Sequence, residues 1–167
     1  MRTKRWARLA GVMMLIGPLL LVARATAGDG ETCVNASDGV AIAACTRAIR
    51  SGRYNGQGLA VLYANRCAAH IKKGETDLAL SDCNQAIQLD PKNAMAFHNR
   101  AAGYSAKGDY DRAIGDLDQV IQLDPKNAMA YANRCAAHFN KGETDLALSD
   151  CNQVIQLDPK NGGSRMP

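Results

Sequence analysis

The chain has 167 residues and a formal net charge of +4, a length that suits one domain. Five basic residues and no acidic residue lie within residues 1–27, so residues 28–167 carry a charge of −1. The basic balance therefore belongs to the N-terminus, and the rest of the chain has no basic stripe of the kind that binds nucleic acid.

Residues 1–27 have the three parts of a secretory signal peptide. A basic start, MRTKRWAR, is followed by an apolar run over residues 9–23 and by ATA, a small-x-small cleavage site. The apolar run has about 15 residues, fewer than the roughly 20 that a membrane span needs. We therefore predict cleavage after Ala27, no stable membrane anchor, and a periplasmic or secreted protein with a Sec-type signal of the Gram-negative bacterial kind.

A period of 34 residues runs through most of the remaining chain. LDPKNAMAFHNR begins at Leu89, LDPKNAMAYANR begins at Leu123, and LDPKN returns at Leu157. A fixed period of this length predicts stacked structural repeats.

Each repeat is predicted to be an antiparallel pair of helices. In the middle repeat Phe97, Ala101 and Tyr104 have the spacing of one face of a helix, and apolar residues over 113–121 form a second helical stripe. Gly108, between the two stripes, is a candidate for a left-handed helix end.

These units resemble the tetratricopeptide repeat, since the middle one has an early aromatic residue, a small residue four positions on, a tyrosine, KGDYDRAI and LDP. The resemblance implies an all-α fold, an α-solenoid with a right-handed superhelix, and no enzymatic activity. GVAIAACTRAI, at residues 39–49, resembles the second helix of a degenerate unit. The implied organisation is a signal peptide (1–27), a degenerate N-terminal half-unit (28–59), three repeats (60–93, 94–127 and 128–161) and a C-terminal tail (162–167).

An Asn-Arg dipeptide recurs in the first helix of each unit, where the family commonly has leucine at the second position. An aspartate follows each arginine by 16 residues, on the facing helix. Because a partly buried arginine needs a carboxylate partner, we predict structural ion pairs and not ligand-binding arginines. The pairs are Arg66 with Asp82, Arg100 with Asp116 and Arg134 with Asp150.

All six cysteines follow residue 27, and an even number in an exported chain is typical of disulfides. The outer repeats have cysteines where the middle repeat has Ala101 and Leu117. In the family these positions form a small–large contact between the two helices of a unit. The resemblance therefore implies the pairs Cys67–Cys83 and Cys135–Cys151, which leaves Cys33 to pair with Cys45.

A metal site is the alternative for the same cysteines. Two thiolates and a histidine three residues after the first of them would suit zinc or copper, but a disulfide removes both thiolates. We therefore expect no metal or other cofactor. The alternative, a thiol or metal sensor, would use Cys67, His70, Cys83, Cys135, His138 and Cys151.

The sequence has no nucleophile elbow, phosphate loop, HExxH motif or CxxC pair. The resemblance instead implies a scaffold that binds a peptide or partner protein on the concave face formed by the first helices. The family's carboxylate clamp is matched at Asn99 but not at Ala64, Ala68, Met129 or Asn133, so binding of chaperone C-terminal tails is not predicted. The alternative is that the asparagines bond within the scaffold. The predicted partner-binding residues are Asn65, Ile71, Met95, His98, Asn99, Met129, Asn133 and Phe139.

The last helix pair raises a second functional hypothesis. Only KNGGSRMP follows Pro159, and repeat arrays normally need a polar cap at each end. Leu148, Ile155 and Leu157 are expected to be partly exposed there. The alternative function is therefore a structural module that forms homo-oligomers through this helix pair.

Overall fold

The computed structural model describes residues 28–35 and 38–159, so the predicted signal peptide and the C-terminal tail lie outside the described residues. Over that part of the chain there are eight helices and no strand, and the predicted all-α solenoid is confirmed. The helices are α1 (Gly28–Asn35), α2 (Asp38–Arg50), α3 (Gly56–Lys72), α4 (Thr76–Leu89), α5 (Ala94–Ala106), α6 (Tyr110–Leu123), α7 (Ala128–Lys141) and α8 (Thr144–Leu157).

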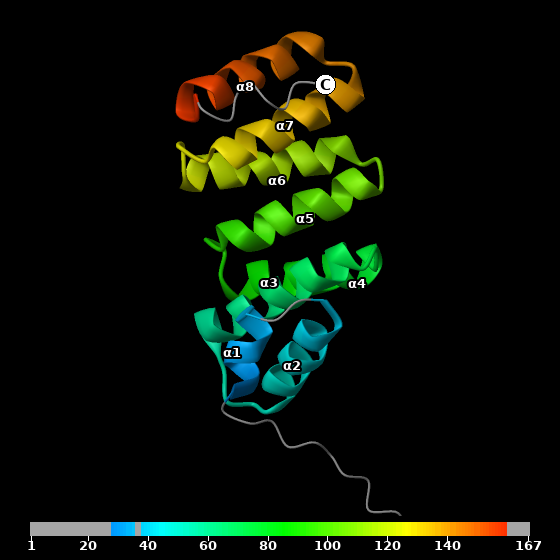
Figure 1. Cartoon of the computed structure of the whole chain (residues 1–167), viewed down its shortest axis with the longest axis vertical. Helices are drawn as coiled ribbons and strands as arrows, with labels where there is room; N and C mark the ends of the chain where they lie inside the picture. Colours follow the sequence, from blue (N-terminus) through cyan, green and yellow to red (C-terminus); the bar gives the residue numbers. More distant parts are fainter. Residues whose placement is uncertain (1–27, 36–37, 160–167) are drawn as a thin grey trace, which may run out of the picture.

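Helix pairs stack in chain order along the long axis of the molecule (Figure 1). In each repeat the first helix packs against the second, and the second packs against the first helix of the next repeat. The N-terminal segment also forms a helix pair. The helix expected over residues 39–49 is α2, and a second helix, α1, precedes it. Cys33 of α1 packs with Cys45 and Ala48 of α2 and with Leu62 of α3, so this pair covers the start of the first repeat.

The helix ends follow from local sequence. The side chains of Asn93 and Asn127 accept hydrogen bonds from the backbone N–H groups of Ala96 and Ala130, both at 3.0 Å, which starts α5 and α7. Gly108 follows α5 with a φ of +74°, a conformation that costs a glycine little and other residues more. The LDPKN and KG motifs are thus the turns of the solenoid.

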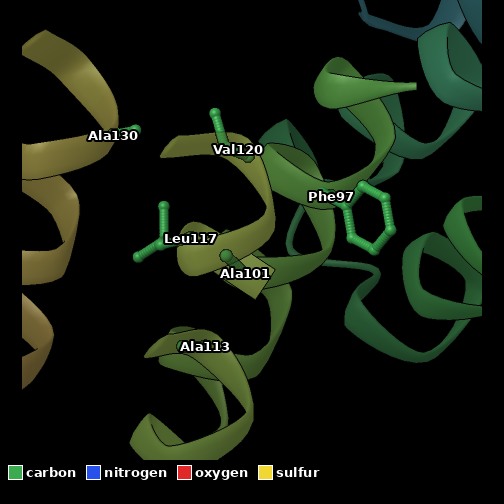
Figure 2. Packing of buried hydrophobic residues seen from close by; sticks show 6 residues of the cluster. All are labelled: Phe97, Ala101, Ala113, Leu117, Val120 and Ala130. Atoms are coloured by element: carbon green, nitrogen blue, oxygen red, sulfur yellow. The ribbon is translucent and has the colours of Figure 1, made fainter. Parts of the chain in front are cut away.

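The middle repeat holds the main hydrophobic cluster of the described chain (Figure 2). Phe97 and Ala101 of α5 pack with Leu117 and Val120 of α6 and with Ala130 of α7. The first repeat has smaller side chains at the equivalent contacts.

Among the described residues, no helix has both the length and the apolar character that a membrane span requires.

Candidate functional site

In each outer repeat, a disulfide joins the two helices at the position where Ala101 packs with Leu117 in the middle repeat. Disulfides link Cys67 to Cys83 and Cys135 to Cys151, with Cα–Cα distances of 5.5 and 5.6 Å. A third links the remaining two cysteines at 4.6 Å. All three distances lie in the range that a disulfide allows, and the described residues contain no free cysteine.

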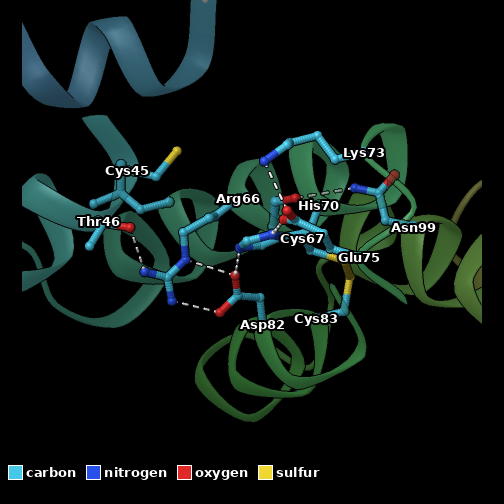
Figure 3. Close-up of polar contacts among 12 residues, drawn as sticks. Cys45, Thr46, Arg66, Cys67, His70, Lys73, Glu75, Asp82, Cys83 and Asn99 are labelled. Atoms are coloured by element: carbon cyan, nitrogen blue, oxygen red, sulfur yellow. Dashed lines mark hydrogen bonds and ion pairs between the residues drawn. A yellow bond between two sulfur atoms is a disulfide. The ribbon is translucent and has the colours of Figure 1, made fainter. Parts of the chain in front are cut away.

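His70 lies beside the first of these disulfides, between two carboxylates (Figure 3). Its Nδ1 is 2.6 Å from Oε2 of Glu75, and its Nε2 is 3.7 Å from Oδ2 of Asp82. Hydrogen bonds from Lys73 and then from His70 lower the pKa of Glu75. With its cysteines oxidised and its histidine held by carboxylates, this part of the described chain has no cluster suited to a metal ion.

The same arrangement recurs in the third repeat. Nδ1 of His138 is 2.6 Å from Oε2 of Glu143. Hydrogen bonds from Lys141 and then from His138 lower the pKa of Glu143. The histidines therefore bond to the loop that joins the two helices of their own repeat.

The recurrent arginines form bidentate ion pairs between the two helices of each repeat. Nε and Nη2 of Arg66 donate to the two carboxylate oxygens of Asp82, both at 2.7 Å (Figure 3). The pairs of Arg100 with Asp116 and of Arg134 with Asp150 repeat this geometry within 0.1 Å. Each aspartate is buried, and its hydrogen bonds hold the guanidinium group against the seam between the helices.

A further contact of each arginine was missed from the sequence. Nη1 donates to a residue on the second helix of the preceding unit, which ties neighbouring units together. The acceptors are Thr46 for Arg66, Asn84 for Arg100 and Asp118 for Arg134. A polar residue 16 positions before two of the three arginines was the available indication.

The first helices of consecutive repeats are joined by side-chain hydrogen bonds, α5 to α3 and α7 to α5, and we call their exposed side the first-helix face. The exposed fractions of Val61, Met95 and Met129, one residue per repeat, are 38, 46 and 63%. Four positions further along each helix lies an asparagine. Apolar side chains and carboxamides thus form parallel rows across α3, α5 and α7.

The asparagines of this face also bond within the scaffold, which was the alternative to ligand contact. Nδ2 of Asn99 donates to the carbonyl oxygen of Ala64 at 3.2 Å. Nδ2 of Asn133 lies 2.7 Å from Nε2 of His98, and desolvation lowers the pKa of that imidazole. The amide of Asn65 donates to a carbonyl oxygen of its own helix at 2.8 Å. The bonds of Asn99 and Asn133 join neighbouring first helices, and each carboxamide can form more hydrogen bonds than these contacts use.

Two predicted partner-binding residues lie elsewhere. Ile71 packs against the cluster around the Cys67–Cys83 disulfide, and a Cβ on Gly103 of α5 would be only 3.2 Å from its Cδ1. It therefore contributes to the contact between the first two repeats and not to the first-helix face. Phe139, at the same position of the third repeat, is 61% exposed because no described helix follows to cover it.

Comparisons with known families agree with this architecture. A tetratricopeptide repeat model matches residues 60–93 and 128–161, a TPR repeat model matches 103–142, and a second tetratricopeptide repeat model matches 83–115. Together these matches extend over residues 60–161. No curated protein matches the chain.

Solved structures share the fold. The second TPR of Spaghetti (RPAP3) bound to HSP90 peptide SRMEEVD is 28% identical, with a TM-score of 0.58, and the match covers 66% of this chain and 98% of that one. The first TPR of the same protein, bound to the same peptide, is 25% identical with a TM-score of 0.62 and coverages of 66 and 87%. MamA, at 22% identity, a TM-score of 0.65 and coverages of 73 and 69%, shows likeness of fold alone.

Proposed function

This chain belongs to the tetratricopeptide repeat family, and we propose that it is an exported scaffold that binds an extended peptide or a partner helix on its first-helix face. The observation that carries the proposal is the row of exposed apolar side chains, Val61, Met95 and Met129, at matching positions of three aligned helices. Water would otherwise contact these side chains, so burying them against a ligand is favourable.

Family and fold support a protein-interaction scaffold. Neighbours of the same fold are bound to a peptide, and the family and fold are typically non-enzymatic. The first-helix face also has the chemistry to hold an extended chain. Carboxamides such as that of Asn99 can donate to and accept from a peptide backbone, while the flexible side chains of Met95 and Met129 adapt to apolar residues.

Export is the part of this proposal that the cysteine pairs support, because disulfides require an oxidising compartment. Disulfides persist in oxidising compartments and are rare in the cytosol. The signal-like residues 1–27 would deliver the chain to such a compartment, where the three pairs of cysteines would oxidise. Closing a loop of about 15 residues stabilises a fold by roughly 3 kcal/mol, which suits a short solenoid with an alanine-rich core.

A binding selection tests the proposal. Peptides selected from a random library on the disulfide-bonded protein are expected to lose at least tenfold in affinity when Met95 and Met129 are both replaced by glutamate. Leu78→Glu and Leu146→Glu are the matched controls, because these leucines are 56 and 53% exposed on second helices. Peptides that bind the double variant as tightly as the wild type would contradict the assignment of this face.

A further inference from the structure

The first and third repeats present nearly the same surface in two different settings. Residues 65–85 and 133–153 differ at only two positions, Ile71/Phe139 and Lys72/Asn140. In the first repeat, α5 packs on both helices of the pair. In the third repeat, at the far end of the solenoid (Figure 1), no described helix takes that place. The described part of the chain therefore contains one copy of this surface that a helix covers and one copy that no described helix covers.

We call the uncovered copy the end face: Phe139, Asp145, Leu148, Asn152 and Ile155. Its apolar members are 61, 59 and 38% exposed, in that order. Their counterparts in the first repeat, Ile71, Leu80 and Ile87, are only partly exposed. The difference arises from the covering helix, since the sequences around them are almost the same.

Helix α5 shows what kind of helix this surface accepts. Gly103 faces the apolar residues of the first repeat, and a Cβ there would lie 2.9 Å from Cδ2 of Leu80 and 3.2 Å from Cδ1 of Ile71. A larger residue there would require these side chains to shift, so the surface favours a small residue at the centre of a covering helix. Ala137 occupies the corresponding position of α7, which covers the second repeat.

Two basic residues complete each internal contact. Nζ of Lys107, the residue that follows α5, is 2.7 Å from Oδ1 of Asp77, and Nη1 of Arg100 in α5 donates to Oδ1 of Asn84 at 2.7 Å. In α7, Lys141 pairs with Asp111 at 2.7 Å and Arg134 with Asp118 at 2.5 Å. Both covering helices thus have the pattern Arg-x-x-small-x-x-x-Lys. On the end face, Asp145 and Asn152 occupy the two acceptor positions.

We propose that the end face binds an amphipathic helix of a partner protein with this pattern, its lysine pairing with Asp145, its arginine with Asn152, and its small residue against Leu148 and Phe139. A second copy bound head to tail would instead offer α1, GDGETCVN, which has neither lysine nor arginine; its Asp29 is buried against Arg47, and its exposed charge is that of Glu31. The charges of the end face therefore favour a basic partner helix.

A peptide of this chain is the probe. The synthetic segment 94–127 contains α5 and α6, and it is titrated into the disulfide-bonded protein. Saturable binding is expected, with a loss of at least tenfold on Leu148→Glu. Leu146→Glu, at a leucine of similar exposure on the same helix, is expected to leave the affinity unchanged, and so is Met129→Glu on the first-helix face. Phe139→Ile restores the residue of the first repeat and should bind at least as tightly as the wild type.

A charge exchange identifies the contact. Lys107→Glu in the peptide should weaken binding, and Asp145→Lys in the protein should restore it. Gly103→Leu in the peptide should weaken binding through the clash with Leu148. Absence of binding to both wild type and Phe139→Ile, or binding that Leu148→Glu leaves intact, would overturn the proposal.

Light scattering of the protein alone tests whether the end face instead binds a second copy of the chain. A monomer is expected over the concentration range of the titration. A dimer that Leu148→Glu dissociates would assign the end face to a second copy and overturn the partner-helix proposal. Neither result depends on the first-helix face, because the selected peptides of the previous test respond to Met95 and Met129 and not to Leu148.

Discussion

The middle repeat and the two outer repeats close the same helix seam in different ways. In the middle repeat, Leu117 packs against Ala101 within a cluster that includes Phe97 and Val120. In the first repeat, a disulfide joins the same two positions, and the buried cluster around it contains Ala79 and the partly buried Ile71. Burial of a leucine contributes about 1.5–3 kcal/mol and a disulfide of this loop length roughly 3 kcal/mol. A covalent bond and an apolar contact can therefore replace one another in one backbone framework.

The difference extends to the residue one turn further along the first helix. His70 bonds to Glu75 of the following loop, whereas Tyr104 stacks against Arg112, whose guanidinium carbon is 4.4 Å from the ring centroid. The partner of His70 is the residue just before the second helix, and the partner of Tyr104 lies in the first turn of that helix. Each repeat thus has a ring with a polar partner at this position, and the chemistry of the partner varies.

Removal of the first repeat's disulfide should have the largest effect. Cys67→Ala with Cys83→Ala loses the covalent link and leaves a cavity, so we expect a loss of about 4 kcal/mol in the free energy of unfolding. Cys67→Ala with Cys83→Leu copies the middle repeat and should recover about half of that loss. Urea denaturation measures both. Equal stability of the two variants would show that packing does not replace the bond.

Truncation of the middle repeat's leucine comes next. Leu117 is 1% exposed, so Leu117→Ala should cost roughly 3 kcal/mol because a cavity remains in the main cluster. Leu148→Ala, at a side chain that is 59% exposed, should change the free energy of unfolding by less than about 0.5 kcal/mol. A large loss at Leu148 would show that the end face is covered in the protein alone.

Loss of an ion-pair carboxylate should cost less. Asp116→Ala leaves the guanidinium group of Arg100 against the helix seam, but that side chain keeps 20% exposure, so we expect about 2 kcal/mol and not the 3–5 kcal/mol of a fully buried pair. Asp145→Ala is the exposed control. Chemical denaturation at neutral pH compares the two, and equal effects would contradict a structural role for the pair.

The smallest effect concerns the loop glutamates. Hydrogen bonds from Lys141 and His138 lower the pKa of Glu143 below its ordinary value of 4.5. A carboxylate with a lowered pKa stabilises the folded state above its unfolded pKa, and that contribution is lost as the pH falls through the folded pKa. Glu143→Gln should therefore be less stable than the wild type at pH 7, with a difference that shrinks in acid. Denaturation midpoints of the two proteins, measured from pH 7 down to below the pKa of Glu143, give the difference in stability. A difference that stays constant with pH would exclude the ionised carboxylate as its cause.

Much of the fold could be predicted because the contacts that define it recur at a fixed spacing. The 34-residue period and the helical stripes led to the solenoid, and the constant separation of Arg100 from Asp116 led to the facing carboxylate. The short helix α1 was not predicted, since its eight residues have too few apolar positions for a clear period. Its stability comes from the disulfide and the packing that join it to α2, the next helix, and from packing on α3, where Leu62 lies 29 residues from Cys33.

The sites were harder to predict because they depend on which surfaces remain open. Ile71 and Phe139 occupy the same position of nearly identical repeats, yet one packs against α5 and the other is mostly exposed. The local sequence cannot predict that difference, because it is nearly the same in the two repeats. The Nη1 contact of Arg134 with Asp118 was missed for the same reason, because it joins helices of different repeats.

By itself the sequence determined the helix pairs, their order and the residues that face one another within each repeat, since these depend on periodicity and on partners within one 34-residue unit. Only the tertiary structure decided how consecutive units meet, and hence which apolar residues are covered and which stay open to a partner. The physical reason is that burial is a property of the stack: the same side chain loses its contact with water only where another helix packs on it.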